Sequence, residues 1–123
     1  MLKTFVLVLI AAIIGGTGHT LLAKGMKSVG DLTEAPSHRL GGMVARALGN
    51  PWLLAGVVLQ ATFFTLYLGL LSRADVSQVL PMTAIDYIVV ALLASVLLGE
   101  AVTPARWAGI GLIVAGVFLV ART

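Results

Sequence analysis

Residues 81 to 100 read Pro-Met-Thr-Ala-Ile-Asp-Tyr-Ile-Val-Val-Ala-Leu-Leu-Ala-Ser-Val-Leu-Leu-Gly-Glu. This stretch is close to the ~20 apolar residues that a helix needs to cross the ~30 Å hydrocarbon core of a bilayer. It carries a carboxylic acid, Asp86, well inside the apolar run. A charge at that depth costs about 3 kcal/mol on insertion scales, so acids there are functional candidates by default. The stretch therefore predicts a membrane-spanning helix and its first candidate site residue.

The composition of the whole chain agrees with a membrane protein. Of 123 residues, 59% are hydrophobic and 11% are charged, whereas soluble domains carry about a quarter charged residues. The absence of cysteine excludes disulfides, thiol chemistry and cysteine-ligated metals. The net charge of +3 arises at the ends of apolar segments, which fits anionic lipid headgroups. No basic stripe with interleaved aromatic residues indicates nucleic acid.

Three further apolar segments predict an all-α fold with four transmembrane helices, at about 4–23, 51–71, 76–98 and 104–120. Asn50 followed by Pro51, and Thr103 followed by Pro104, are typical helix starts. Asp75 has capping-box spacing to Gln78. A signal peptide is the alternative for the first segment, but the apolar run continues past the usual length and lacks a cleavage site.

The long connection from residue 24 to 50 is kept out of the hydrocarbon by its charged residues. Apolar residues recur within it at helical spacing, with Arg39 and Arg46 on the other side, so a short interfacial helix at about 39–49 is one interpretation. An irregular loop is the other, because Gly41 and Gly42 weaken a helix. Five basic residues on this side against three on the side of the termini weakly favour a cytoplasmic long loop.

Three runs of sequence resemble a known family. They are Gly18 to Met26 at the end of the first helix, Leu70 to Ser77 followed by Pro81, and Leu98 to Gly109 at the last turn. These runs resemble small drug/metabolite-transporter superfamily proteins with an EamA-type domain. The resemblance implies a single four-helix EamA-like or small-multidrug-resistance-like unit, in the bacterial inner membrane, without cofactor or metal. Because so short a chain encloses little space, we expect a homodimer or a heterodimer with a related subunit.

Among four-helix members, the chain is most similar to E subunits of flippases for undecaprenyl phosphate-linked aminoarabinose. In those subunits an Asn-aromatic pair stands where this chain has Asp86-Tyr87, and a Gln is usual where it has His19. Small multidrug-resistance exporters carry an essential Glu midway along their first helix. Residues 12–16 contain no acid, so that mechanism is disfavoured unless Asp86 has taken over the role.

Counting ~1.5 Å per helical residue from the long-loop side gives each polar group a depth in the membrane. His19 falls at ~7 Å, Gln60 at ~13 Å, Asp86 at ~18 Å and Tyr67 at ~24 Å. The count predicts a spaced polar route. A direct pair of His19 and Asp86 would need a tilt or a kink, which Pro81 can supply.

The candidate site residues fall into three sets. For substrate binding and translocation they are Asp86, His19, Gln60, Tyr67, Thr83 and Tyr87; for a lipid phosphate or headgroup, Lys24, Lys27, Arg39 and Arg46; and for helix packing between subunits, Ala108, Gly111 and Ala115. Each has a purely structural alternative. Asp86 can be a neutral acid hydrogen-bonded to Thr83, Gln60 can join helices, and the lysines can be interfacial anchors.

These observations support three hypotheses. The first is a transporter that flips a lipid-linked or amphipathic substrate such as an undecaprenyl phosphate-linked sugar. The second is a proton-coupled exporter of small cations or metabolites, and the third is a non-transporting partner subunit of a membrane complex. An enzyme is disfavoured, because the sequence offers neither a nucleophile-base constellation nor a metal-ligand cluster.

Overall fold

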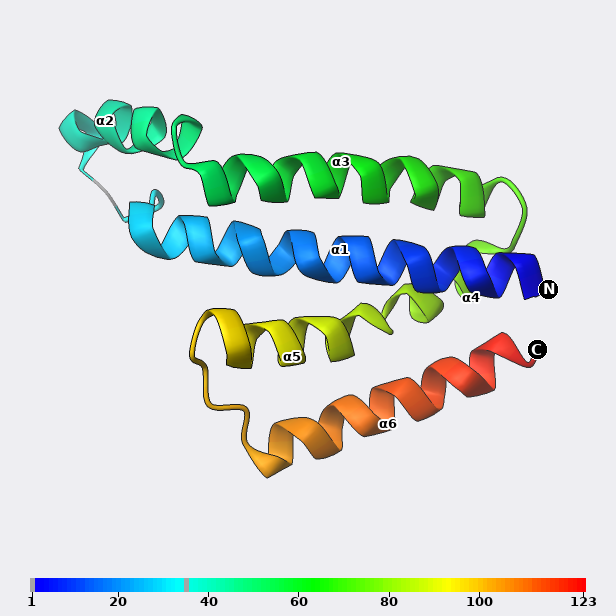
Figure 1. Cartoon of the computed structure of the whole chain (residues 1–123). Helices are drawn as coiled ribbons and strands as arrows, with labels where there is room; N and C mark the ends of the chain where they lie inside the picture. The colour runs from blue at the N-terminus through cyan, green and yellow to red at the C-terminus, as the bar shows by residue number, and fades with distance from the viewer. Residues whose placement is uncertain (1, 35) are drawn as a thin grey trace.

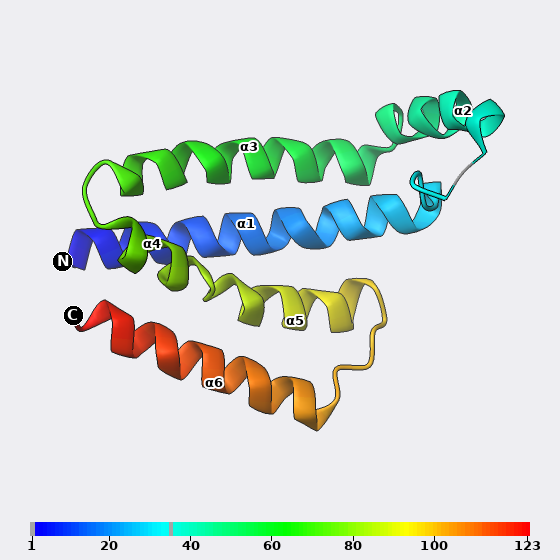
Figure 2. The same cartoon turned by 180° about the vertical axis from the view of Figure 1, so that it is seen from behind.

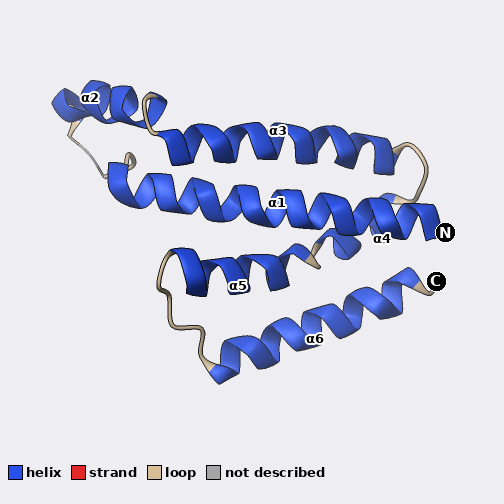
Figure 3. Cartoon of the chain, viewed as in Figure 1, coloured by secondary structure: helices blue, strands red, loops and turns tan. Residues whose placement is uncertain are grey.

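The computed structural model describes residues 2–34 and 36–123, and every regular element in these ranges is a helix (Figures 1 and 3). In chain order the helices are α1 (Leu2–Val29), α2 (Ser37–Leu48), α3 (Pro51–Leu71), α4 (Val76–Thr83), α5 (Asp86–Leu97) and α6 (Pro104–Ala121). When α4 and α5 are counted as one span, the structure has four segments that are long and apolar enough to cross a membrane. The predicted all-α membrane fold is confirmed.

Helix α1 lies at the centre of the bundle (Figures 1 and 2). It packs against α3 on one side and against α4 and α5 on the other, while α6 packs on α4 and also contacts α1 through Phe118 and Phe5. Helix α6 starts apart from α5 and approaches the rest of the bundle towards the C-terminus, and the two chain termini lie at the same end, as predicted (Figure 2). The short helix α2 lies beyond the opposite end, beside the start of α3.

Glycines permit the close approach of α1 and α3. A methyl group added at Gly56 would lie 2.8 Å from the backbone nitrogen of Leu22 and 3.0 Å from the carbonyl oxygen of Gly18. A methyl group at Gly25 would lie 2.8 Å from the nitrogen of Leu53. Small residues at such crossings let membrane helices gain dispersion contacts along their backbones. The α1–α3 pair is therefore the tightly packed part of the fold.

The third span is two helices, which corrects the predicted continuous helix at 76–98. Helix α4 passes through Pro81 and ends at Thr83, and α5 starts at Asp86. Between them, the backbone N–H groups of Ala84 and Ile85 donate to carbonyls three residues back, at 3.0 and 3.3 Å. Proline weakens the helix that contains it by removing one N–H donor. Here the chain tightens into a 3₁₀-like turn just after the proline instead of bending at it.

Helix α1 ends at Val29, six residues beyond the predicted end at 23. Lys24 and Lys27 did not stop it, because lysine favours helices and its long stem carries the charge out of the apolar layer. Gly30 ends the helix with a φ of +104°, a left-handed conformation that favours glycine. In the loop that follows, the hydroxyl and backbone N–H of Thr33 donate to Asp31 and hold the pKa of that exposed carboxyl below its usual value.

Two of the three predicted helix caps form. Asn50 Oδ1 accepts from the N–H groups of Trp52 and Leu53 at 2.9 and 3.2 Å, and Thr103 Oγ1 accepts from the Arg106 N–H at 3.2 Å. Asp75 makes no side-chain bond to its helix, so the predicted capping box is wrong. The predicted helix in the long connection is confirmed. It is α2, which starts at Ser37, two residues before the predicted start at 39, and ends at Leu48, one residue before the predicted end at 49.

Candidate functional site

Asp86 is placed against α1 by the break in the third span. It is the first residue of α5 and only 6% of its surface is exposed. Gly16 of α1 faces it: a methyl group there would lie 3.1 Å from the Asp86 carbonyl oxygen and 2.7 Å from Val89 Cβ. The absence of a side chain at Gly16 therefore allows α5 to begin directly on the surface of α1, with its acid in the interior of the bundle.

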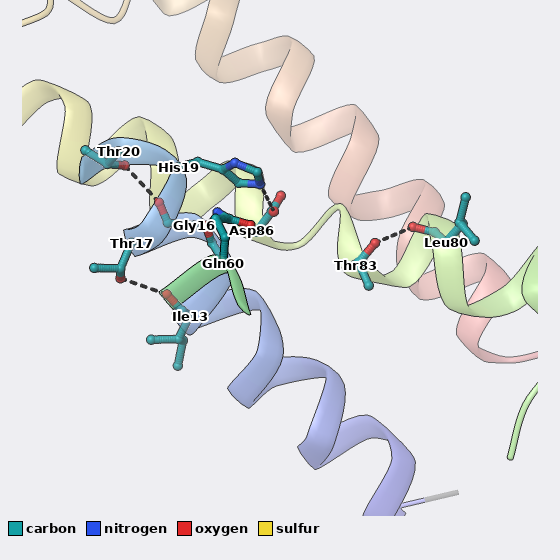
Figure 4. A network of polar contacts seen from close by, with 10 residues as sticks. Ile13, Gly16, Thr17, His19, Thr20, Gln60, Leu80, Thr83 and Asp86 are labelled. Atoms are coloured by element: carbon teal, nitrogen blue, oxygen red, sulfur yellow. Dashed lines mark hydrogen bonds and ion pairs between the residues drawn. The ribbon is translucent and has the colours of Figure 1, made fainter. Parts of the chain in front are cut away.

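His19 and Asp86 lie side by side, which corrects the depth count that separated them by about 10 Å. His19 Nε2 is 3.7 Å from Asp86 Oδ2 (Figure 4), and the histidine side chain is half exposed. The count measured the depth of His19 from a helix end at residue 23, whereas α1 ends at Val29. The six added residues lengthen the helix by about 9 Å, so His19 and Asp86 lie at nearly the same depth.

The Asp86 carboxylate accepts no hydrogen bond from residues 2–34 or 36–123 within the described structure. Thr83, its predicted hydrogen-bond partner, donates to the Leu80 carbonyl at 2.6 Å instead (Figure 4). Among the described residues, every side-chain oxygen or nitrogen atom that is fully buried has a hydrogen-bond partner. Because the carboxylate has no hydrogen-bond donor, its oxygens must retain access to the space beside them.

That space is a cavity of about 220 Å³, here called the Asp86 cavity. Its lining residues are His19, Phe63, Leu80, Thr83, Ala84, Asp86 and Tyr87. The helices α1, α3, α4 and α5 and the turn between the last two all contribute. It thus unites four of the six residues predicted for substrate binding, and it adds Phe63. The sequence signal for Phe63 was weak, because a phenylalanine in an apolar helix is the ordinary case.

Gln60 and Tyr67 do not line the cavity, and each has a structural contact in the bundle. Gln60 Nε2 donates to the Gly15 carbonyl at 3.0 Å and so joins α3 to α1. The Tyr67 ring stacks on Phe63, with centroids 6.0 Å apart, and packs against the core formed by α1, α3, α4 and α6. For Gln60, this contact agrees with its alternative role of joining two helices.

The four basic residues predicted to hold a headgroup occupy different places. Lys24 Nζ lies 4.1 Å from the centre of the Trp52 ring, a cation–π contact, and Lys27 pairs with Glu100 at 3.9 Å. Arg39 and Arg46 line an open groove of about 600 Å³ between α2 and the end of α1. The structure therefore divides the predicted set into two lysines with partners on the bundle and two arginines on α2.

The small residues of α6 lie on the outside of the bundle. Ala108, Gly111 and Ala115 are all exposed, and a methyl group at Gly111 would meet nothing within 4 Å. A second cavity of about 240 Å³ lies between α5 and α6, and its lining includes Glu100 and Arg106. Within the described residues, no cluster of three or more histidine and acidic side chains could hold a metal.

Comparison with known proteins now decides the family. The EamA-like transporter family matches residues 38–122, more than half of the chain. The chain belongs to the EamA-like transporter family. It is accordingly an integral membrane protein of transporter type and not an enzyme, and the predicted resemblance to the drug/metabolite transporter superfamily is confirmed.

EamA-family relatives at moderate identity extend this assignment. A Pseudomonas paraeruginosa protein is 34% identical over 84% of this chain and 91% of its own length, and a Pseudomonas aeruginosa protein is 34% identical over 85% and 92%. A Pseudomonas savastanoi protein is 32% identical over 64% and 69%. Each is named "Probable 4-amino-4-deoxy-L-arabinose-phosphoundecaprenol flippase subunit ArnE". No solved structure matches the chain.

Proposed function

We propose that the chain is a flippase subunit that moves a lipid-linked, amphipathic substrate across the bacterial inner membrane. The polar headgroup passes through the Asp86 cavity while the lipid tail stays in the bilayer. The observation that carries this proposal is a buried acid at the wall of a cavity in an otherwise apolar bundle. Buried ionisable groups within membrane spans mark substrate or ion pathways. The names of the relatives supply the class of substrate.

The accessibility of the cavity residues supports entry from the side. The side chain of His19 is half exposed and Tyr87 is 48% exposed, whereas Asp86 is buried. Two residues of the lining therefore reach the outer surface of the bundle, partway along its spans, while the acid stays inside. A lateral opening of this kind admits a headgroup without drawing an apolar tail out of the hydrocarbon.

Two observations support function as a dimer. A volume of about 220 Å³ is below the roughly 300–1,000 Å³ typical of pockets that enclose a small ligand, so one chain surrounds only part of a headgroup. The exposed Gly111 and Ala115 of α6 are four residues apart, the spacing that lets membrane helices of two subunits approach closely. A homodimer or a heterodimer with a related subunit would complete the site.

The test is lipid flipping by purified protein in liposomes. Proteoliposomes containing an undecaprenyl phosphate-linked amino sugar are treated with a membrane-impermeant amine reagent, and the reactive fraction is followed with time. We expect the labelled fraction to rise from one leaflet's share towards all of the lipid, and Asp86→Asn to slow the rise. Asp75→Asn is the matched control, because Asp75 is exposed and makes no side-chain bond to its helix. Equal rates in protein-free and loaded liposomes, with or without a related subunit, would refute the proposal.

The proximity of His19 and Asp86 favours a second candidate, proton-coupled export of small cations. Two titratable groups 3.7 Å apart at a cavity wall could exchange a proton for a cationic substrate. Proton release on addition of substrate to solubilised protein distinguishes the two functions. A flippase that carries its headgroup without proton exchange shows none.

A further inference from the structure

We propose that the groove between α2 and the end of α1, here called the α2 groove, binds the phosphate of an anionic bilayer phospholipid. This site is separate from the Asp86 cavity and does not depend on the proposed function. The lining of the α2 groove consists of Val29, His38, Arg39, Gly42, Met43 and Arg46. No acid is among these lining residues, and the two ion pairs recorded in residues 2–34 and 36–123 involve neither arginine. The groove therefore carries positive charge that no carboxylate of the described chain neutralises.

Two arginines stand on either side of an open space in the α2 groove. Arg39, Gly42 and Arg46 share one face of α2, because they are three and seven residues apart. Seven residues correspond to about 10.5 Å of helix rise, and a methyl group added at Gly42 would meet nothing within 4 Å. A guanidinium group donates paired N–H bonds to phosphate oxygens. Since both arginine side chains are long and exposed, a phosphate over Gly42 lies within reach of both.

The α2 groove is a fixed part of the fold. Met43 of α2 is buried, and its Cε would lie 3.3 Å from a methyl group at Gly30. Just after α2, Asn50 Nδ2 donates to Ser28 Oγ at 2.7 Å and to the Gly25 carbonyl at 3.3 Å. Both the middle of α2 and the connection that follows it are thus joined to the end of α1, so the helix presents its arginines from a defined position.

The α2 groove lies at the depth of lipid headgroups. Helix α1 has 28 residues, which give it a length of about 42 Å, and a bilayer with its headgroup layers measures about 40–45 Å. With Lys3 in the headgroup layer at one end of α1, Val29 reaches the opposite layer. Helix α2 lies beyond that end, beside the start of α3 (Figure 1). There Trp52 is typical of the membrane interface.

The apolar part of the lining favours a lipid over a free phosphate. Val29 and Met43 line the groove together with the arginines. A phospholipid brings its glycerol and first methylene groups with the phosphate and so covers both kinds of surface. Phosphatidylcholine also carries a phosphate, but its ammonium group would lie near two guanidinium groups and be repelled by them. A lipid with net negative charge such as phosphatidylglycerol fits best, and basic pockets at the ends of membrane helices suit such headgroups.

The test measures lipid binding to the full chain by native mass spectrometry. Phosphatidylglycerol and phosphatidylcholine with the same acyl chains are titrated onto the purified protein, and we expect phosphatidylglycerol to be retained in preference. Arg39→Gln and Arg46→Gln should each weaken its binding about fivefold, and the double variant about 25-fold, with phosphatidylcholine binding unchanged. Arg73→Gln is the matched control, because Arg73 is exposed and follows α3 at the opposite end of the bundle.

Two adjacent glycines test the position of the site. Gly42→Leu should fill the groove and remove the preference for phosphatidylglycerol, whereas Gly41→Leu should keep it, because Gly41 does not line the groove. A methyl group at either glycine would meet nothing within 4 Å, so both variants should fold, which circular dichroism checks. A preference that persists in the double arginine variant or in Gly42→Leu would overturn the proposal. Complete displacement of phosphatidylglycerol by inorganic phosphate would overturn the assignment to a lipid.

Discussion

Replacement of Gly16 by alanine should separate α5 from α1 and thereby disrupt the Asp86 cavity. The added methyl carbon would lie 2.7 Å from Val89 Cβ, 2.8 Å from Val89 Cγ1 and 3.1 Å from the Asp86 carbonyl oxygen. These distances are too short for van der Waals contact, and Val89 Cβ is fixed to the backbone of α5. The start of α5 must therefore move away by about 0.7 Å, the shortfall from the 3.4 Å at which ordinary contact begins.

The size of the effect follows from two opposing terms. Overpacking of this kind costs about 1–3 kcal/mol, whereas alanine gains about 1 kcal/mol over glycine within a helix. We expect a net loss of up to about 2 kcal/mol in the free energy of unfolding. We also expect slower flipping, because the start of α5, which moves, carries Asp86. Denaturing detergent titration followed by circular dichroism measures the first quantity, and the liposome assay measures the second.

Gly69→Ala is the matched control, because a methyl group at Gly69 in α3 would meet nothing within 4 Å. It should be neutral or stabilise the protein by up to about 1 kcal/mol, from helix propensity alone. If Gly16→Ala proves as stable and as active as Gly69→Ala, the close packing of α5 on α1 at this point is wrong. The argument for how Asp86 is positioned would then fail with it.

Three further predictions concern other contacts of the fold. Gly56→Ala should lower the unfolding free energy by up to about 2 kcal/mol in the same detergent titration, since its methyl group would lie 2.8 Å from the backbone nitrogen of Leu22; a stability gain would contradict the α1–α3 packing. Asn50→Ala should cost about 1–2 kcal/mol, because the side chain caps α3, while Asp75→Ala should change thermal stability by less than about 0.5 kcal/mol since it makes no such bond. Gly111→Leu should weaken subunit association in light scattering and leave the helix content unchanged; an unaltered dimer would place the subunit interface elsewhere.

The terminal regions of the helices show what local sequence could predict. Asn50 and Thr103 act as caps where a polar side chain precedes a proline at the first helical position. The same reasoning failed for Asp75, whose spacing to Gln78 suits a capping box that does not form. A capping motif permits a bond between neighbours in sequence but does not require it. The end of α1 was missed because lysine favours helices in the interface as much as it marks their boundary.

The candidate site shows where prediction from the sequence ended. Asp86, His19, Thr83 and Tyr87 were named from their chemistry, since a polar group in an apolar span is conspicuous in any sequence. Phe63 was not named, because only a cavity distinguishes it from the other apolar residues of α3. Gln60 was named for transport, yet its amide holds two helices together. Residue chemistry selected the candidates, and neighbours in space decided the role that each can play.

The sequence by itself determined the membrane environment, the four apolar spans and the family, because apolar length and family motifs are local properties of the chain. Only the tertiary structure decided that His19 and Asp86 lie 3.7 Å apart. That proximity depends on two features far apart in sequence, the missing side chain at Gly16 and the break between α4 and α5. A count of rise per residue places each group along its own helix axis. The count also depends on where each helix ends, and only the structure showed that α1 continues to Val29, which brings His19 to the depth of Asp86.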